Sequence, residues 1–290
     1  MRRSLRFASL ALCLVLGSFG FAQTCVRTDI LVQGGSIYPG SINRYETVVG
    51  FFYPADGSPE LAFRWNNGVF NTYQYPGATA TQFAASNDKG QIVGSYFKSN
   101  GSNGIQHGLL FENGTFTSMD YPGAAQTFLT GINNAGDIVG YFQSATGGED
   151  HAFLKHGSKW TELVPPKGID PDASAISNSG EVLGHYSTND GIFTYVYRDG
   201  QYTTLRSKPG AAFTAGFAIN KYQSVVGYFE NGNDYPAYTY KNGIFYTYTY
   251  PAPKGSVLRT IYTGINDLGD RVGYADLASG GTQGFVMKCR

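Results

Sequence analysis

The sequence predicts an all-β fold, a six-bladed β-propeller built from four-stranded antiparallel blades. Three observations carry this prediction: a repeat that occurs six times, four short apolar runs in each repeat, and two chain ends that together supply one repeat. A fixed period of about 40 to 50 residues with four strands per unit is typical of propeller blades. The composition agrees, because 39 Gly, 22 Tyr and 20 Phe in 290 residues indicate strands joined by tight turns.

Taken in order, the chain opens with a segment typical of a secretory signal. Arg2 and Arg3 precede an apolar run, Phe7 through Leu16, and small residues follow up to Ala22. We therefore expect residues 1–22 to be removed, residues 23–290 to form a single domain, and the protein to be periplasmic or extracellular. The apolar run is too short to span a bilayer and no longer run follows, so we expect no membrane insertion.

The two ends of the mature chain are predicted to share one blade. The N-terminal part has room for an outer strand, Val26 to Val32, and an inner strand, Ser36 to Ile42, whereas the part after the sixth repeat turn holds only two strands. We expect the N-terminal strand to complete the last blade, which closes the ring without exposed half-units. Cys25 and Cys289 flank the hairpin turn that this blade lacks, and in an oxidising compartment they predict a disulfide.

The repeat is clearest from Thr130 to Phe142, which reads TGINNAGDIVGYF. Each copy has an anchor asparagine at the turn between its first two strands, and the steps between anchors are 44, 46, 45, 42 and 46 residues. The anchors are Asn43, Asn87, Asn133, Asn178, Asn220 and Asn266. Asn tolerates a left-handed backbone and can hydrogen-bond its own turn, so we expect these residues to belong to the scaffold.

The unit around Asn133 shows the four strands of a blade, which we call A to D from the first to the last. They are predicted at Thr127 to Ile132, Ile138 to Phe142, His151 to Lys155 and Trp160 to Val164. Strands of this kind read as nearly continuous apolar runs because both faces of a blade are buried. Asn-Gly and Asp-Gly pairs between strands C and D, such as Asn67-Gly68 and Asp199-Gly200, predict tight hairpins.

Every strand B contains a glycine at the same position. A glycine inside a strand marks a close approach of another backbone, and we expect a neighbouring blade to come close there. These six glycines are Gly50, Gly94, Gly140, Gly184, Gly227 and Gly273.

The units resemble the HAF-type extracellular repeat family, whose name motif stands intact at His151-Ala152-Phe153. Looser copies stand in the same slot at Leu61-Ala62-Phe63, His107-Gly108-Leu109 and Gln283-Gly284-Phe285, and the fourth and fifth units depart from the motif. The resemblance covers essentially the whole mature chain. It implies a secreted bacterial repeat protein and no particular activity.

No residue pattern stands out as a catalytic or metal centre. The four histidines have no zinc spacing, and we expect them to be structural. Paired carboxylates at Glu149-Asp150 and Asp170-Pro171-Asp172 offer oxygen ligands, although neither has the spacing of a dedicated calcium loop. We therefore expect no cofactor and keep calcium as an alternative.

An enzyme is the alternative to a binding module, namely a hydrolase, lyase or lactonase with its site on the face of the B-to-C loops. Such a site would need Asp, Glu, His or Asn near the starts of several A strands. Those segments instead carry hydroxyl and apolar groups, as in Ser36-Ile37-Tyr38 and Ala173-Ser174-Ala175. A propeller fold alone assigns no activity.

The two rims of the predicted ring differ in charge. The B-to-C loops and D-to-A crossings form one rim, the loop rim, and the A-to-B and C-to-D turns form the other, the corner rim. The B-to-C loops vary between blades and hold eight acids against a single lysine, Lys98. The acids are Asp56, Glu60, Glu149, Asp150, Asp190, Glu230, Asp234 and Asp276. The C-to-D corners are mainly basic, with Arg64, Lys155, Lys159, Arg198, Lys241, Lys288 and Arg290 against Glu112 and Asp199.

Variable loops on a rigid scaffold are where binding usually takes place. We expect the acidic loops to bind a polar ligand that is neutral or cationic, such as a glycan or a protein, and to repel nucleic acid. The sequence thus favours a secreted, monomeric binding module.

Overall fold

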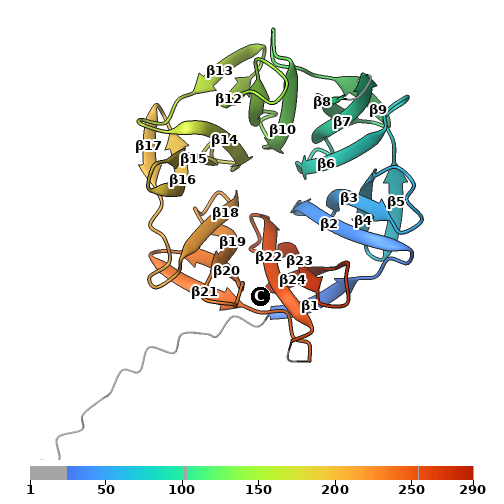
Figure 1. Cartoon of the computed structure of the whole chain (residues 1–290), viewed down its shortest axis with the longest axis vertical. Coiled ribbons are helices and arrows are strands. Elements are labelled where there is room, and N and C mark those ends of the chain that lie inside the picture. The colour runs from blue at the N-terminus through green and yellow to red at the C-terminus, as the bar shows by residue number, and fades with distance from the viewer. Residues whose placement is uncertain (1–24, 101–102, 254, 290) are drawn as a thin grey trace, which may run out of the picture.

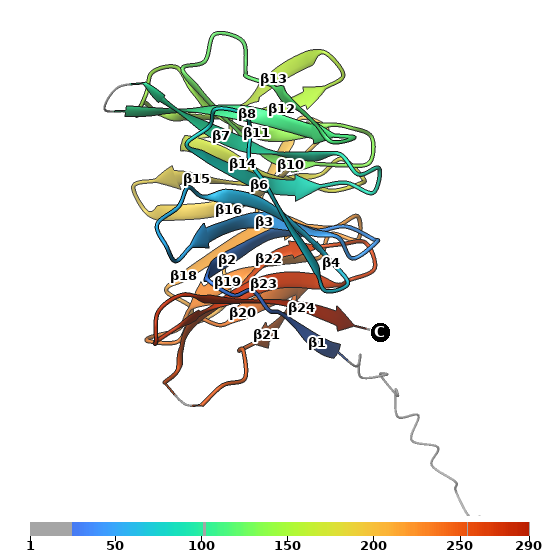
Figure 2. The same cartoon turned by 90° about the vertical axis from the view of Figure 1, so that its right-hand side faces the viewer.

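The computed structural model describes residues 25–100, 103–253 and 255–289, so the predicted signal segment, residues 1–22, lies outside the described residues. Six four-stranded antiparallel sheets form a ring, and each sheet is one blade of a six-bladed propeller. Figure 1 looks down the ring axis, and Figure 2 shows the ring from its edge. The fold class predicted from the sequence is confirmed.

Strand A of each blade lies next to the axis in Figure 1, and strand B follows it outward. In blades 1 to 6 the A strands are β2 (Gly35–Ile42), β6 (Ala80–Ser86), β10 (Gln126–Ile132), β14 (Ile169–Ile176), β18 (Phe213–Ile219) and β22 (Val257–Ile265). The B strands are β3 (Val48–Pro54), β7 (Ile92–Asn100), β11 (Ile138–Gln143), β15 (Val182–Thr188), β19 (Val225–Glu230) and β23 (Arg271–Leu277).

Strands C and D form the outer half of each blade. The C strands are β4 (Leu61–Asn66), β8 (Asn103–Glu112), β12 (Asp150–His156), β16 (Gly191–Arg198), β20 (Ala237–Lys241) and β24 (Thr282–Cys289). The D strands are β5 (Val69–Tyr73), β9 (Thr115–Ser118), β13 (Lys159–Leu163), β17 (Gln201–Thr204), β21 (Ile244–Tyr248) and, for blade 6, β1 (Cys25–Ile30).

The ring closes as predicted, because β1 pairs with β24 and completes blade 6. A disulfide joins Cys25 to Cys289 where these two strands begin and end. The predicted hairpins between strands C and D also occur, since Asn67 and Gly68 both have positive φ, as do Asp199 and Gly200.

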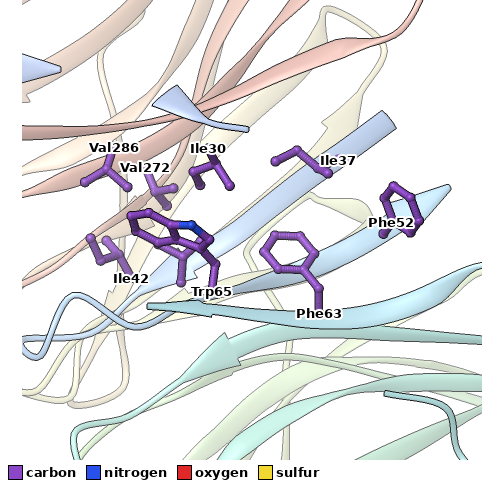
Figure 3. Close-up of a cluster of buried hydrophobic side chains, with 9 residues drawn as sticks. Ile30, Ile37, Ile42, Phe52, Phe63, Trp65, Val272 and Val286 are labelled. Atoms are coloured by element: carbon purple, nitrogen blue, oxygen red, sulfur yellow. The ribbon is translucent and has the colours of Figure 1, made fainter. Parts of the chain in front are cut away.

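Blades pack face to face through apolar clusters. Figure 3 shows the cluster that seals the ring, in which Phe63 and Trp65 of blade 1 lie against Ile30, Val272 and Val286 of blade 6. All five side chains are buried. The completed blade therefore packs against its neighbour as the other blades do, and burial of apolar surface holds the ring together.

The sequence prediction for the strand glycines was wrong about the partner. A Cβ on Gly140 would lie 1.9 Å from the carbonyl oxygen of Phe128 and 2.9 Å from the Phe153 ring. Phe128 belongs to strand A and Phe153 to strand C of the same blade, so the close approach is within the blade. The cause is a β-bulge in strand A, between Leu129 and Gly131, opposite this glycine. The other five glycines meet the strand A backbone of their own blade in the same way.

The anchor asparagines are scaffold residues, but not through a left-handed backbone. In blade 1, Asn43 Oδ1 accepts hydrogen bonds from the backbone N–H groups of Tyr45 and Thr47. Its Nδ2 donates to the carbonyl of Asn87 in the next blade. The positive φ falls three residues after the anchor, at Glu46 in blade 1. Each of the five asparagine anchors thus shapes its own turn and links two blades.

The fourth anchor is Ser177, one residue before the predicted Asn178. Ser177 N donates to the carbonyl of Glu181 as the other anchors do to their own turns, and Ser177 Oγ accepts from the backbone N–H groups of Ser179 and Glu181. A serine has no amide with which to reach blade 5. The side chain of Glu181, which is buried, takes over this link by accepting a hydrogen bond from Gln223 of blade 5, and it also accepts one from Arg198 of its own blade.

Candidate functional site

Polar turn residues surround the mouth of the axial channel on the corner rim. They follow the anchors, and they hydrogen-bond one another around the ring. Asn178 Nδ2 also donates to Asp267 Oδ2 at 2.8 Å, which joins blade 4 to blade 6. A cavity of about 100 Å³ remains beneath this polar network. The room for a ligand on this side of the axis is therefore small.

Six bulge residues narrow the channel halfway along the axis. Each is the residue that the register of strand A skips, and all six border both the corner-rim cavity and a second cavity on the loop-rim side. They are Gly40, Ala84, Thr130, Ser174, Phe217 and Thr263. The strand B glycine permits each bulge, so the repeat motif itself builds this constriction.

Above the constriction lies a funnel of about 320 Å³ that opens on the loop rim. One cross-strand pair per blade surrounds it, formed by the residue five positions before the anchor and the residue after the strand B glycine. The pairs are Tyr38–Phe51, Gln82–Ser95, Phe128–Tyr141, Asp172–His185, Ala215–Tyr228 and Ile261–Tyr274. Seven of these side chains line the cavity: Tyr38, Phe51, Gln82, Ser95, Tyr141, Asp172 and Tyr274.

Aromatic rings form most of the funnel wall. Tyr38 stacks on Phe51 with ring centroids 5.0 Å apart and meets the edge of Tyr274 at 5.1 Å, and Tyr141 stacks on Phe128. Burial raises the pKa of Tyr141, and it raises the pKa of Tyr274 to about 12. These phenols therefore stay protonated at neutral pH, and they present both apolar ring faces and O–H donors.

Asp172 and His185 form the ionic pair of the funnel. His185 Nδ1 lies 3.1 Å from Asp172 Oδ2, and the backbone N–H of His185 also donates to Asp172. Burial alone would lower the pKa of His185 and raise that of Asp172. The mutual attraction and hydrogen bonds outweigh burial, so the pKa of His185 is raised and that of Asp172 is lowered. The pair is thus ionised and neutral overall near pH 6.

Ser174 completes this cluster without making it a catalytic relay. Its Oγ donates to Asp172 Oδ1 at 2.7 Å and lies 3.2 Å from the same His185 Nδ1 that faces Asp172. A relay needs the serine and the carboxylate on opposite nitrogens of the imidazole. His185 Nε2 is instead buried without a hydrogen-bond partner. The cluster orients hydrogen-bonding groups toward the funnel.

Amides and one acid form hydrogen bonds across blades 2 and 3, and one of these amides, Gln106, contacts Ser95 of the funnel lining. Gln106 Nε2 donates to Ser95 Oγ at 2.6 Å, and Gln126 Nε2 donates to Gln143 Oε1 at 2.8 Å. Gln143 Nε2 in turn donates to Asp150 Oδ1 at 2.8 Å. Because these side chains hold one another, their remaining donors and acceptors are preorganised.

The acidic residues predicted as the site fall into two groups. Asp56, Glu149, Asp190 and Asp234 are exposed on the loops and are not part of the funnel lining. Glu60, Asp150, Glu230 and Asp276 are half-buried, and they too are absent from the funnel lining. Three of these four are in strands and not in loops: Asp150 in β12, Glu230 in β19 and Asp276 in β23.

The predicted loop from Lys98 is also mostly strand. Strands β7 and β8 continue to Asn100 and Asn103, with Phe97 opposite Gln106 and Lys98 opposite Ile105. Strand pairing therefore reaches farther than the turn residues indicated.

The charge contrast between the rims is weaker than the count of charged residues in the B-to-C loops suggested. Arg259 forms an ion pair with Asp276 at 2.6 Å. The D-to-A crossings, which the loop count left out, bring Lys167 and Lys208 to the same rim. Burial raises the pKa of Glu60 and of Asp150, which favours their neutral forms. The funnel mouth is therefore only mildly acidic.

Sequence reasoning missed the residues that line the funnel. Four of the six residues after the strand B glycine are aromatic, namely Phe51, Tyr141, Tyr228 and Tyr274, and this column was a usable signal. Asp172 was noted only as one of the paired carboxylates, and its place in the funnel was missed because the fourth anchor was placed one residue too late. In a strand, a shift of one residue moves every side chain to the other face.

Among the described residues, no three His, Cys, Asp or Glu side chains gather as metal ligands would, and the calcium alternative stays untested. The described part of the chain also contains no helix long and apolar enough to cross a membrane.

No protein-family model matches the sequence, and no curated protein matches it. Membership in the HAF-type family therefore stays a prediction.

Solved propeller structures do match the fold. TolB from Acinetobacter baumannii has a TM-score of 0.53 at 13% identity, covering 84% of this chain and 65% of its own. A gluconolactonase from Xanthomonas campestris has a TM-score of 0.52 at 11% identity, covering 88% and 87%. A fucose-specific lectin from Aleuria aurantia has a TM-score of 0.50 at 12% identity, covering 92% and 94%. Likeness at this level of identity shows the fold alone.

Proposed function

We propose that this protein is an exported binding module and that its ligand, a neutral saccharide, enters the axial funnel from the loop rim. One observation carries the proposal. Among the described cavities on the axis, only the funnel opens at the loop rim. It combines the aromatic rings of Tyr38, Phe51, Tyr141 and Tyr274 with the polar groups of Gln82, Ser95 and Asp172. Ligand pockets typically pair apolar, aromatic walls with a few convergent hydrogen-bonding groups.

The charge state favours a neutral ligand over a cation. Asp172 is neutralised by His185 and Asp276 by Arg259. A sugar ring offers apolar C–H faces to the aromatic wall and hydroxyls to the fixed amides and carboxylates. The disulfide supports export, since such bonds persist mainly in oxidising compartments.

The enzyme alternative uses the same funnel. The observation in its favour is the pair of Asp172 and His185, because perturbed ionisable groups in a cavity are candidate catalytic groups. Incubation of each bound saccharide with the protein, followed by chromatography, separates the two functions. A binding module leaves the saccharide intact, whereas an enzyme releases a product.

The proposal is tested with residues 23–290 on a glycan array, followed by calorimetric titration of the saccharides that bind. The quadruple variant Glu149→Gln, Asp150→Asn, Asp190→Asn and Asp234→Asn removes loop charge outside or at the edge of the funnel. For a neutral saccharide in the funnel, this variant should bind within about twofold of wild type. Binding of cationic compounds alone, lost in the quadruple variant, would overturn the proposal.

A further inference from the structure

A large groove lies on the corner rim, between blades 5 and 6. This groove has a volume of about 830 Å³, and Tyr222, Tyr246, Lys241 and Arg271 are among the residues that line it. Tyr222 is 58% exposed and Tyr246 is 56% exposed, so two aromatic side chains face solvent there. The groove is separate from the axial funnel and shares none of its lining residues.

The groove exists because blade 6 departs from the repeat. At the first residue of strand B, the five other blades carry a buried aliphatic side chain: Val48, Ile92, Ile138, Val182 and Val225. Blade 6 has Arg271 at this position. In the same row of each of these five blades, two strands farther out, strand D carries an aromatic side chain. These residues are Phe70, Phe116, Trp160, Tyr202 and Phe245.

In blade 6 the ring is replaced by Arg27, which forms an ion pair with Asp29 and lies over Tyr250. Two apolar groups that elsewhere fill the space between blades are therefore absent between blades 5 and 6.

Arg271 is an arginine in a core position without a matching acceptor. Its Nη1 lies 2.7 Å from Cys289 Sγ and 3.9 Å from Cys25 Sγ, and sulfur is a weak acceptor. Its Nε is buried without a hydrogen-bond partner. Burial lowers the pKa of Arg271 against the attraction of Tyr262 and Asp270, so its charge is poorly compensated. A buried cation in this state favours an incoming oxyanion.

We propose that the groove between blades 5 and 6 binds an acidic saccharide through its carboxylate. The guanidinium fork of Arg271 matches a carboxylate in shape, and Lys241 adds a second positive charge at the edge of the groove. The exposed rings of Tyr222 and Tyr246 offer apolar faces for the sugar ring. The groove lining carries two cations, Lys241 and Arg271, against one acid, Asp267, so its net charge favours an anion. This site does not depend on the function proposed for the funnel.

The test is calorimetric titration of residues 23–290 with a galacturonate trisaccharide and with its methyl ester, which keeps the ring and removes the charge. We expect the acid to bind at least about tenfold more tightly than the ester, because a charge-assisted pair to arginine is lost in the ester. Equal affinity for acid and ester, or no binding of the acid at millimolar concentration, would overturn the site.

Two variants and one control assign the binding to the groove. Arg271→Ile restores the aliphatic residue type of the other blades, so this variant should fold. It should weaken binding of the acid by about tenfold or more. Tyr222→Ala removes an exposed ring and should weaken the binding of acid and ester alike. This variant tests the site even if Arg271→Ile fails to fold. Arg64→Gln removes an exposed arginine from the same rim of blade 1 and should leave the affinity unchanged. Unchanged affinity in Tyr222→Ala, with Arg271→Ile unfolded or equally unchanged, refutes the assignment.

Discussion

Single residues of the repeat act through backbone contacts that no side-chain property reveals. Gly140 is the example, because a methyl group on it would overlap the carbonyl oxygen of Phe128 at 1.9 Å. We expect Gly140→Ala to lower the free energy of unfolding by roughly 2 to 4 kcal/mol, since either the bulge or the strand must shift. Urea denaturation measures this.

Gly104→Ala is the matched control. It also lies in a strand, but its added Cβ would meet nothing closer than 3.9 Å. Equal stability of the two variants would show that the strand glycines are not required for the bulge.

The pair of Asp172 and His185 predicts a pH dependence of stability. The pKa of His185 is raised from its ordinary 6.5, so its contribution is complete below pH 6.5 and is lost as pH rises through the folded pKa. The pKa of Asp172 is lowered from 3.8, so its contribution is complete above pH 3.8 and is lost as pH falls further. The difference in melting temperature between wild type and His185→Gln should be largest between these values and smaller at pH 9. A difference that stays constant from pH 5 to pH 9 would contradict this pairing.

At the scale of elements, the anchor turns hold the blades in register. Asn266 accepts hydrogen bonds from the backbone of Leu268 and Asp270 and donates to the carbonyl of Asn43, which joins blade 6 to blade 1. Asn266→Ala leaves several buried groups without partners and should cost roughly 2 to 4 kcal/mol. Asn71→Ala, at an exposed position of β5, should stay within about 0.5 kcal/mol of wild type. Thermal melting compares them, and equal midpoints would rule out a linking role for the anchors.

The strands and their order were predictable because the period, the turn residues and the apolar runs all indicate the same arrangement. The funnel was less predictable, because the face to which a strand side chain points depends on the register of that strand to within one residue. In blade 4, Ser177 replaces the anchor asparagine, and the neighbouring Asn178 was therefore taken for the anchor in the sequence. The bulges were invisible for a similar reason, since a skipped residue such as Thr130 looks like any other strand residue in the sequence.

At the scale of the whole molecule, closure joins residues 264 positions apart through one disulfide. A loop of this size predicts an entropic contribution of about 5 kcal/mol as an upper value. The double variant Cys25→Ser and Cys289→Ser should melt at a lower temperature than wild type, and a reductant should lower the melting temperature of wild type alone. Two titratable thiols in the denatured, unreduced protein would show that the bond does not form in solution.

The two ends of the axial channel differ in size and in chemistry. On the corner rim, a polar network that includes Asn134, Asn178 and Asp267 borders a cavity of about 100 Å³, and on the loop rim the aromatic funnel has a volume of about 320 Å³. The repeat therefore builds a hydrogen-bonded polar network on one side, whereas differences between the repeats shape the other side.

Calorimetric titration of an array-selected saccharide into two tyrosine variants tests the direction of ligand entry. Tyr141→Ala removes a ring that lines the funnel, and Tyr45→Ala removes a 61% exposed ring from the corner rim of blade 1. We expect Tyr141→Ala to weaken binding by about tenfold or more and Tyr45→Ala to leave it unchanged, because only the first ring contacts the ligand. Unchanged affinity in Tyr141→Ala together with lost affinity in Tyr45→Ala would contradict binding in the funnel.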